Sequence, residues 1–511
     1  MKLQHIALSA LALMASAWPM ADIKAEKLVL LHTNDTHSHI DPVDGSDMGG
    51  ILRRKVLIDS VRAAEPNVLL IDAGDIVQGT LYFHLYKGEV EQRLMNELGY
   101  DMQIMGNHEF DNGIDALADI YATATPELLS TNYDLTETPL DTLFHTYTIR
   151  RFGDKKIGFF ALNLKPKGMI ADGNARGIKV LDWRTAANAT AWHLKHNEKV
   201  DAVVAITHVG YDRAPADTLF VDRDIAAGTS DIDIIIGGHS HTLINPDDPK
   251  SPTWRVANAN GDSVLIAQAG RYGTYLGEVT IDLDDMTATS RVIPVDSRLD
   301  SRTDPALAEI IRPYREGVES LYSTWISKAS RNLSNKEPGL LNFAADFVLD
   351  RGRQLADGVQ LAIVNKGGIR RSLSKGKISE GELIDMMPFA NRTTVIDILG
   401  SDLTEALDIM AMRGGDGVSD GVEATFDPST GRCTSITIDG KPVDPDATYR
   451  IATIDYLANG GDYMSPLTRG TKIAESSSML YDDLIRYLRD GKMKNKSINP
   501  SPVARMKPIA E

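Results

Sequence analysis

The chain has 511 residues, which is too long for one hydrophobic core and predicts two or three domains. Hydrophobic residues make up 42% of it and charged residues 24%, which is typical of a globular protein and argues against disordered or repeat architectures. The net charge of −17 argues against a protein that coats nucleic acid or binds an anionic membrane. We therefore expect no nucleic acid polymer and no stable membrane anchor as partners.

The first residues have the pattern of an export signal. Lys2 and His5 give a basic start, residues 6–14 form an apolar segment, and residues 15–17 read Ala-Ser-Ala, a typical cleavage motif. The apolar segment is too short to span a bilayer. We predict a signal peptide over residues 1–21 and a periplasmic or secreted protein. Cys433 is the only cysteine of the sequence, so an intrachain disulfide is excluded.

Residues 27–299 alternate short apolar runs with longer amphipathic stretches. This alternation predicts an α/β domain with helices outside one or two sheets. The predicted strands are 28–31, 68–71, 102–105, 157–162, 202–207, 232–236, 264–267 and 276–281, and the predicted helices include 49–64, 90–98, 114–122 and 183–197.

A second α/β unit is predicted over residues 332–495, after a linker helix within 300–331. Residues 300–328 are rich in charge and helix formers and show no strand pattern. The last residues contain three prolines and little periodicity, so we expect 496–511 to be a loosely ordered tail. In the second unit the predicted strands are 361–364, 394–399, 435–438 and 449–454, and the predicted helices 340–355, 401–412 and 478–489.

Five of the predicted strands in the first unit run into residues of metal-ligand type. In an open α/β sheet the strand ends are where ligands bind. If the first strand stays extended, Asp35 and His37 point to the same side. Carboxylate and imidazole donors repeated at five strand ends predict a divalent metal site. The residues concerned are Asp35, His37, Asp75, Asn107, His108, His208, His239 and His241.

The motifs Asp35-x-His37, Gly74-Asp75-x-x-Gln78-Gly79, Gly106-Asn107-His108-Glu109, His208 and Gly238-His239-x-His241 resemble the calcineurin-like metallophosphoesterases. With the second unit, the chain resembles the exported 5′-nucleotidases, a group that also contains UDP-sugar hydrolases and cyclic-nucleotide phosphodiesterases. The resemblance implies a four-layer α/β/β/α sandwich, a linker helix and a smaller C-terminal α/β substrate-binding domain. It also implies rotation of the two domains about the linker.

The resemblance implies two divalent metal ions, for which zinc, manganese and cobalt are equally suitable. One ion would be held by Asp35, His37, Asp75 and His241, and the other by Asp75, Asn107, His208 and His239. His108, paired with Asp111, would stabilise the transition state or protonate the leaving oxygen.

In the second unit, the resemblance implies a nucleoside pocket. Asn365 and Arg370 would lie near phosphate or ribose, Phe389 and Tyr456 would clamp the base, and Asp462 would bind the ribose hydroxyls. Two lysines, Lys336 and Lys366, depart from the arginine and glycine common in relatives. The predicted substrate-binding residues are Lys336, Asn365, Gly367, Gly368, Arg370, Phe389, Tyr456 and Asp462.

We predict metal-dependent hydrolysis of nucleoside 5′-monophosphates to nucleoside and phosphate, with UDP-sugars as a further substrate, for nucleotide scavenging outside the cytoplasm. One alternative is a 2′,3′-cyclic-nucleotide 2′-phosphodiesterase/3′-nucleotidase, or a sulfur-ester hydrolase, on the same scaffold. Another is a non-catalytic periplasmic nucleotide-binding protein, against which the intact pair of His108 and Asp111 argues. The native metal, the preferred base and the oligomeric state stay open.

Overall fold

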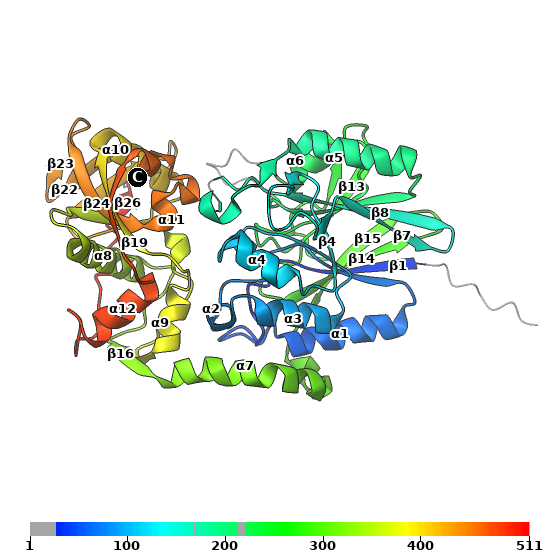
Figure 1. Ribbon diagram of the computed structural model, residues 1–511, viewed down its shortest axis with the longest axis horizontal. Coiled ribbons are helices and arrows are strands. Elements are labelled where there is room, and N and C mark those ends of the chain that lie inside the picture. The colour runs from blue at the N-terminus through cyan, green and yellow to red at the C-terminus, as the bar shows by residue number, and fades with distance from the viewer. Residues whose placement is uncertain (1–26, 168, 171, 213–219, 510–511) are drawn as a thin grey trace, which may run out of the picture.

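The computed structural model describes residues 27–167, 169–170, 172–212 and 220–509. The predicted signal peptide lies outside these residues. The described chain forms two bodies joined by the long helix α7 (Pro305–Ser323), with the N-terminal body blue to green and the C-terminal body yellow to red (Figure 1). Within the described ranges, no helix is both long and apolar enough to cross a bilayer.

The N-terminal body contains, in its described residues, two large sheets, with strand orders β15-β14-β1-β2-β3-β4-β6 and β12-β13-β11-β10-β8-β7, and a small sheet of β5 (Tyr133–Asp134) and β9 (Lys179–Val180). The first sheet consists of β1 (Lys27–Thr33), β2 (Val68–Asp72), β3 (Met102–Ile104), β4 (Glu127–Leu129), β6 (Phe144–His145), β14 (Tyr275–Asp282) and β15 (Ala288–Pro294). The second consists of β7 (Tyr147–Phe152), β8 (Lys155–Asn163), β10 (Ala202–His208), β11 (Ile234–Ile236), β12 (Arg255–Ala257) and β13 (Ser263–Ala267). The helices are α1 (Ile51–Ala64), α2 (Leu81–Tyr86), α3 (Glu89–Leu98), α4 (Ile114–Tyr121), α5 (Trp183–Trp192) and α6 (Asp222–Gly228).

Successive residues of β1 show how the layers stack. Leu28 and Leu30 pack into the core between the two sheets, whereas Val29 and Leu31 pack against the residues of α1 and α3. A separate apolar cluster joins the outer face of the second sheet to α5 and α6, which cover it in Figure 1. Strands buried on both faces explain why the sequence shows continuous apolar runs here. The predicted four-layer sandwich is confirmed.

The C-terminal body is also α/β, as predicted. Its main sheet has the order β20-β17-β24-β19-β25, and a second sheet has the order β23-β22-β21-β26. The strands are β17 (Leu361–Val364), β19 (Thr393–Leu399), β20 (Gly417–Val418), β21 (Val422–Asp427), β22 (Arg432–Ile438), β23 (Lys441–Pro442), β24 (Thr448–Ile454), β25 (Thr471–Glu475) and β26 (Met506–Pro508). The helices are α8 (Pro338–Leu355), α9 (Glu380–Met386), α10 (Gly400–Met412), α11 (Asp455–Ala458) and α12 (Leu480–Arg489).

Two expectations about the chain outside the main sheets are wrong. The segment after α7 contains strand β16 (Trp325–Ala329), which pairs with β18 (Gly376–Ser379) although its sequence shows no strand pattern. The expected loose tail is packed: Ile498 is fully buried, and β26 pairs in parallel with β21. Both segments form strands because their backbones pair with strands far away in the sequence, and a local hydrophobic pattern does not predict such pairing.

Candidate functional site

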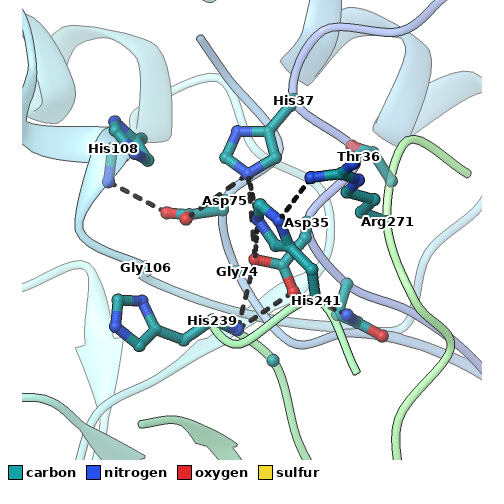
Figure 2. A network of polar contacts seen from close by, with 12 residues as sticks. Asp35, Thr36, His37, Gly74, Asp75, Gly106, His108, His239, His241 and Arg271 are labelled. Carbon is teal, nitrogen blue, oxygen red and sulfur yellow. Dashed lines mark hydrogen bonds and ion pairs between the residues drawn. The ribbon is translucent and has the colours of Figure 1, made fainter. Parts of the chain in front are cut away.

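The predicted metal ligands come from the ends of strands in both sheets of the N-terminal body. Asp35 and His37 follow β1, and Asp75 follows β2. His208 is the last residue of β10, and His239 follows β11 closely. The two sheets face each other, so their strand ends bring these side chains together, as Figure 2 shows for all of them except His208.

The backbone that carries these ligands is left-handed, which corrects the expectation of an extended strand. Strand β1 ends at Thr33, and φ is 50° at Asp35 and 47° at His37. Asp75 and His239 also have positive φ, of 57° and 81°. Such a conformation costs about 1–2 kcal/mol for each non-glycine residue. Side chains therefore converge because the chain turns at each strand end, and the cost is stored where ligands are needed.

Donor atoms within 4.8 Å of one another form three groups, two of which consist of residues from the two predicted ion sites. We name Asp35, His37 and His241 the Asp35 cluster, and Asp75, His208 and His239 the Asp75 cluster. In the first, His241 Nε2 lies 3.4 Å from Asp35 Oδ1, and in the second, His208 Nε2 lies 3.1 Å from Asp75 Oδ2. His37 Nε2 lies 3.8 Å from a carboxylate oxygen of both Asp35 and Asp75, so the two clusters are contiguous.

The donor chemistry of these clusters fits divalent metal ions. His37 Nδ1 lies 3.1 Å from the Gln78 carbonyl oxygen, and His208 Nδ1 lies 2.7 Å from that of Ala73. A carbonyl only accepts, so both rings hold hydrogen on Nδ1 and present Nε2 to the clusters. Asn107 Oδ1 is buried and has no hydrogen-bond partner in the described structure. An ion would use these unpaired acceptors.

Burial and charge act against each other in the two carboxylates. Burial raises the pKa of Asp35 to about 7. Burial would also raise the pKa of Asp75, but the imidazoles of His208 and His108 outweigh it and hold that pKa well below its usual range. Asp75 is therefore a carboxylate at neutral pH, and a cation beside Asp35 would ionise that group as well.

His108 has the environment of a general acid. Its Nδ1 lies 2.9 Å from Asp111 Oδ2, and its backbone N–H donates to Asp75 Oδ1 at 2.9 Å. Burial would lower the pKa of His108, but the carboxylates of Asp111 and Asp75 outweigh it and raise the pKa to about 8. The His108 ring is consequently a positively charged imidazolium at neutral pH. Its donor atoms also lie within 4.8 Å of those of His37 and Asp75.

One cavity of about 590 Å³ joins the metal clusters to the C-terminal body. Lys336 is exposed and does not line this cavity, so the structure does not bring it to the site. Asp35, His37 and His208 also do not line it, although the clusters that contain them do. The predicted residues that line it are Asp75, Asn107, His108, Asp111, His239 and His241 from one body, and Asn365, Gly367, Gly368, Arg370, Phe389, Tyr456 and Asp462 from the other.

The C-terminal side of the cavity is an aromatic and polar network. Asp462 accepts hydrogen bonds from Asn365 Nδ2 at 2.7 Å and from the Tyr456 hydroxyl at 3.0 Å. The Arg370 guanidinium lies 5.0 Å from the centroid of the Phe389 ring. That ring lies 5.9 Å from the His108 ring, measured between centroids, so Phe389 connects this network to the metal clusters.

Several residues at the site are missing from the set predicted by sequence. Arg271 and Tyr272 follow strand β13, and Arg271 Nη1 lies 3.3 Å from His241 Nδ1. The rule that ligands follow strand ends could have found this pair, because the apolar run of β13 predicts a strand. Asn391, Asn459 and Met479 also line the cavity. These three carry no short motif, and only the fold shows where they lie.

Comparison with known proteins agrees with this geometry. Residues 28–243 match the family model of the calcineurin-like phosphoesterases, and residues 319–469 match that of the 5′-nucleotidase C-terminal domain. The human 5′-nucleotidase is 28% identical, with 88% of this chain and 86% of the relative covered. The trifunctional nucleotide phosphoesterase YfkN of Bacillus subtilis is 28% identical over 94% of this chain, which spans only 35% of that relative.

Among solved structures, a 5′-nucleotidase precursor from Thermus thermophilus superposes with a TM-score of 0.82 at 29% identity. The match covers 95% of this chain and 100% of that one. The order of the two matched domains and the cavity lined by residues of both bodies lead to the same conclusion. The chain is a metal-dependent phosphoester hydrolase built from a calcineurin-like phosphoesterase domain followed by a 5′-nucleotidase C-terminal domain.

Proposed function

We propose that the chain hydrolyses nucleoside 5′-monophosphates to a nucleoside and phosphate. The observation that supports this most is the single cavity lined by both the Asp75 cluster and the aromatic residues of the other body. A metal site alone would fit any phosphate ester. An aromatic pair that lines the same cavity selects an ester with a planar base.

The cofactors in this proposal are two divalent ions. Asp35, His37, Asp75 and His241 would hold one, and Asp75, Asn107, His208 and His239 the other. Mixed nitrogen and oxygen donors suit zinc, manganese and cobalt alike. When bound, the pair supplies a water of lowered pKa and positive charge beside the phosphoryl oxygens.

The protein's own groups perform the remaining steps. His108 gives its proton to the 5′ oxygen as the nucleoside leaves, and Asp111 keeps the ring protonated and oriented. Arg370 binds a phosphoryl oxygen. Phe389 and Tyr456 stack on the two faces of the base, while Asp462 accepts hydrogen bonds from the ribose. Lys336 has no part in the proposal, because it is exposed outside the cavity.

A substrate panel tests this proposal. The metal-loaded protein is assayed with AMP, UDP-glucose, 2′,3′-cyclic AMP and p-nitrophenyl phosphate, with and without EDTA. We expect AMP to be hydrolysed with the highest kcat/KM, EDTA to abolish turnover, and Asp75→Ala to be inactive. Tyr456→Ala should lower kcat/KM for AMP about 5- to 150-fold through lost stacking, with p-nitrophenyl phosphate turnover unchanged.

Each contrary result identifies another function. A preference for the cyclic nucleotide would indicate the phosphodiesterase, and saturable AMP binding without phosphate release would indicate a binding protein. Equal losses for AMP and p-nitrophenyl phosphate in Tyr456→Ala would refute the base clamp. We also propose that the protein acts outside the cytoplasm, on the strength of the export pattern in residues 1–21, and cell fractionation checks this location.

A further inference from the structure

His241 is bonded differently from the other imidazoles of the metal clusters. Its Nδ1 lies 3.3 Å from Nη1 of Arg271, as Figure 2 shows. A guanidinium has donors and no acceptor, so His241 Nδ1 must accept and the neutral ring must hold its hydrogen on Nε2. That Nε2 lies 3.0 Å from His37 Nε2 and 3.4 Å from Asp35 Oδ1. The hydrogen therefore points at the atoms that would share an ion.

The loop that carries Arg271 is fixed to the loop of Asp35. The side chain of Asn34 accepts from the backbone N–H of Ala269 and donates to the carbonyl of Gly270, both at 2.8 Å. The backbone N–H of Tyr272 donates to the carbonyl of Asp35 at 2.7 Å. These hydrogen bonds therefore fix the backbone of Arg271 next to the Asp35 cluster.

Stacking holds the guanidinium itself. Its central carbon lies 4.6 Å from the centroid of the Tyr272 ring. The Tyr272 ring also stacks on the His39 ring, with the two centroids 3.9 Å apart. None of the ion pairs found among the described residues includes Arg271, so its positive charge is not neutralised by a carboxylate contact.

The two clusters consequently differ in their readiness for a cation. In the Asp35 cluster, an ion can bind His241 Nε2 only if the ring moves its hydrogen to Nδ1, where Arg271 offers no acceptor. The ion is also repelled by the positive charge of Arg271. In the Asp75 cluster, His208 donates from Nδ1 to the Ala73 carbonyl, which directs its Nε2 at Asp75 with no arginine behind the ring among the described residues. Arg271 is not hydrogen-bonded to any member of that cluster in the described structure.

We propose that Arg271 is a positioning residue that weakens the ion site of the Asp35 cluster relative to that of the Asp75 cluster. The two ions then bind with unequal affinity, and the Asp35 cluster loses its ion first. This inference rests on the two-ion assignment in the proposed function, and the test separates the two.

Metal-free full-length protein is titrated with Co²⁺ and followed by calorimetry and visible absorption. The parent should bind two ions, with dissociation constants at least tenfold apart. In Arg271→Gln the glutamine carbonyl can accept from Nδ1 and the charge is gone, so the weaker site should tighten about 10- to 100-fold. The dissociation constant of the tighter site should change by less than about twofold, because Arg271 does not contact the Asp75 cluster.

Two matched variants control for charge and for general damage. Arg271→Lys keeps a cationic donor and should bind like the parent. Arg255→Gln removes another exposed arginine that stacks on a ring at 4.6 Å, that of Trp254, and should also bind like the parent. Adding His241→Ala to Arg271→Gln should cancel the gain, which assigns the weaker site to the Asp35 cluster.

Nitrogen-15 NMR of the metal-free parent gives a second readout, because it should show hydrogen on Nε2 of His241. Equal affinities of the two ions in the parent, or equal tightening of both sites in Arg271→Gln, would overturn the inference. Binding of a single ion by the parent would instead overturn the two-ion assignment.

Discussion

At the scale of single residues, Glu109 shows how the ligand loops are held. Its carboxylate accepts hydrogen bonds from the backbone N–H groups of Gly106 at 2.6 Å, Ile76 at 2.8 Å and Asp75 at 3.1 Å. Buried N–H groups without a strand partner are costly. One side chain therefore satisfies the loops that carry Asp75 and Asn107, without lining the cavity.

Glu91 on α3 gives a prediction of pH-dependent stability. It is 5% exposed, and burial raises its pKa from 4.5 to about 7. The folded state thus binds this proton more tightly than the unfolded state, and the free energy of unfolding falls as pH rises from about 4.5 to 7. The loss is about 3 kcal/mol. Glu91→Gln should remove it.

Denaturant unfolding of parent and variant between pH 4.5 and 8 measures this effect. We expect the stability of Glu91→Gln relative to the parent to increase across that range. Glu97→Gln, an exposed change on the same helix, should follow the parent at every pH. If the curves of Glu91→Gln and the parent run parallel, Glu91 is charged in the folded state.

At the scale of elements, the C-terminal segment is part of the second body. Asn342 on α8 donates to the carbonyls of Ser501 and Val503, at 3.0 and 2.9 Å. Arg505 forms an ion pair with Asp346 of the same helix at 2.7 Å. The segment therefore clamps α8 and adds strand β26 to the second sheet.

Ile498→Ala should lower the free energy of unfolding by about 2–5 kcal/mol, because Ile498 is fully buried and the change leaves a cavity. Val503→Ala removes two methyl groups from a side chain of the same segment that is 63% exposed. Its effect should stay within about 0.5 kcal/mol. Calorimetric unfolding of both variants checks this, and equal stabilities would mean that the segment is not docked in solution.

The sequence predicts those elements whose burial leaves a long local pattern. Strands β1 and β10 are predictable because they are apolar over several consecutive residues, and the residues after them attract attention as ligands. Strands β4, β6 and β26 have three residues or fewer, which is too short for periodicity. The left-handed turns at Asp35 and Asp75, and the contacts of Arg271, depend on loops that meet only after folding.

At the scale of the whole molecule, the site exists only where the two bodies meet. Beyond the shared cavity, Arg371 pairs with Asp44 at 2.8 Å. The rings of His84 and Tyr481 contact edge to face, with centroids 4.7 Å apart. Residues from α2 and α12 thus connect the two bodies. We expect that a nucleoside bound in the cavity needs the bodies to separate before it leaves.

A reversible crosslink tests this requirement. His84→Cys and Tyr481→Cys are combined and joined by a short bifunctional thiol reagent that a reductant cleaves. We expect AMP turnover to fall about tenfold or more, because opening controls product release, and to recover after reduction. Cys433 should stay unmodified, because burial raises its pKa to about 12.

Each single-cysteine variant treated with the same reagent controls for its chemistry and should keep its activity. Undiminished AMP turnover in the crosslinked protein would show that substrate and product exchange without separation of the bodies.

The position of β1 in its sheet has a consequence for how the chain folds as it is made. One neighbour, β2, follows soon after it, but the other, β14, pairs Lys27 with Asp282 in the antiparallel register. Synthesis runs from the N-terminus, and residues 34–274 must be made after β1 before its partner β14 begins to emerge. Until then the nascent chain exposes an unpaired strand edge, which is a target for chaperones and for aggregation. The N-terminal body can complete its sheet only after β14 and β15 are synthesised, and the C-terminal body is synthesised later still.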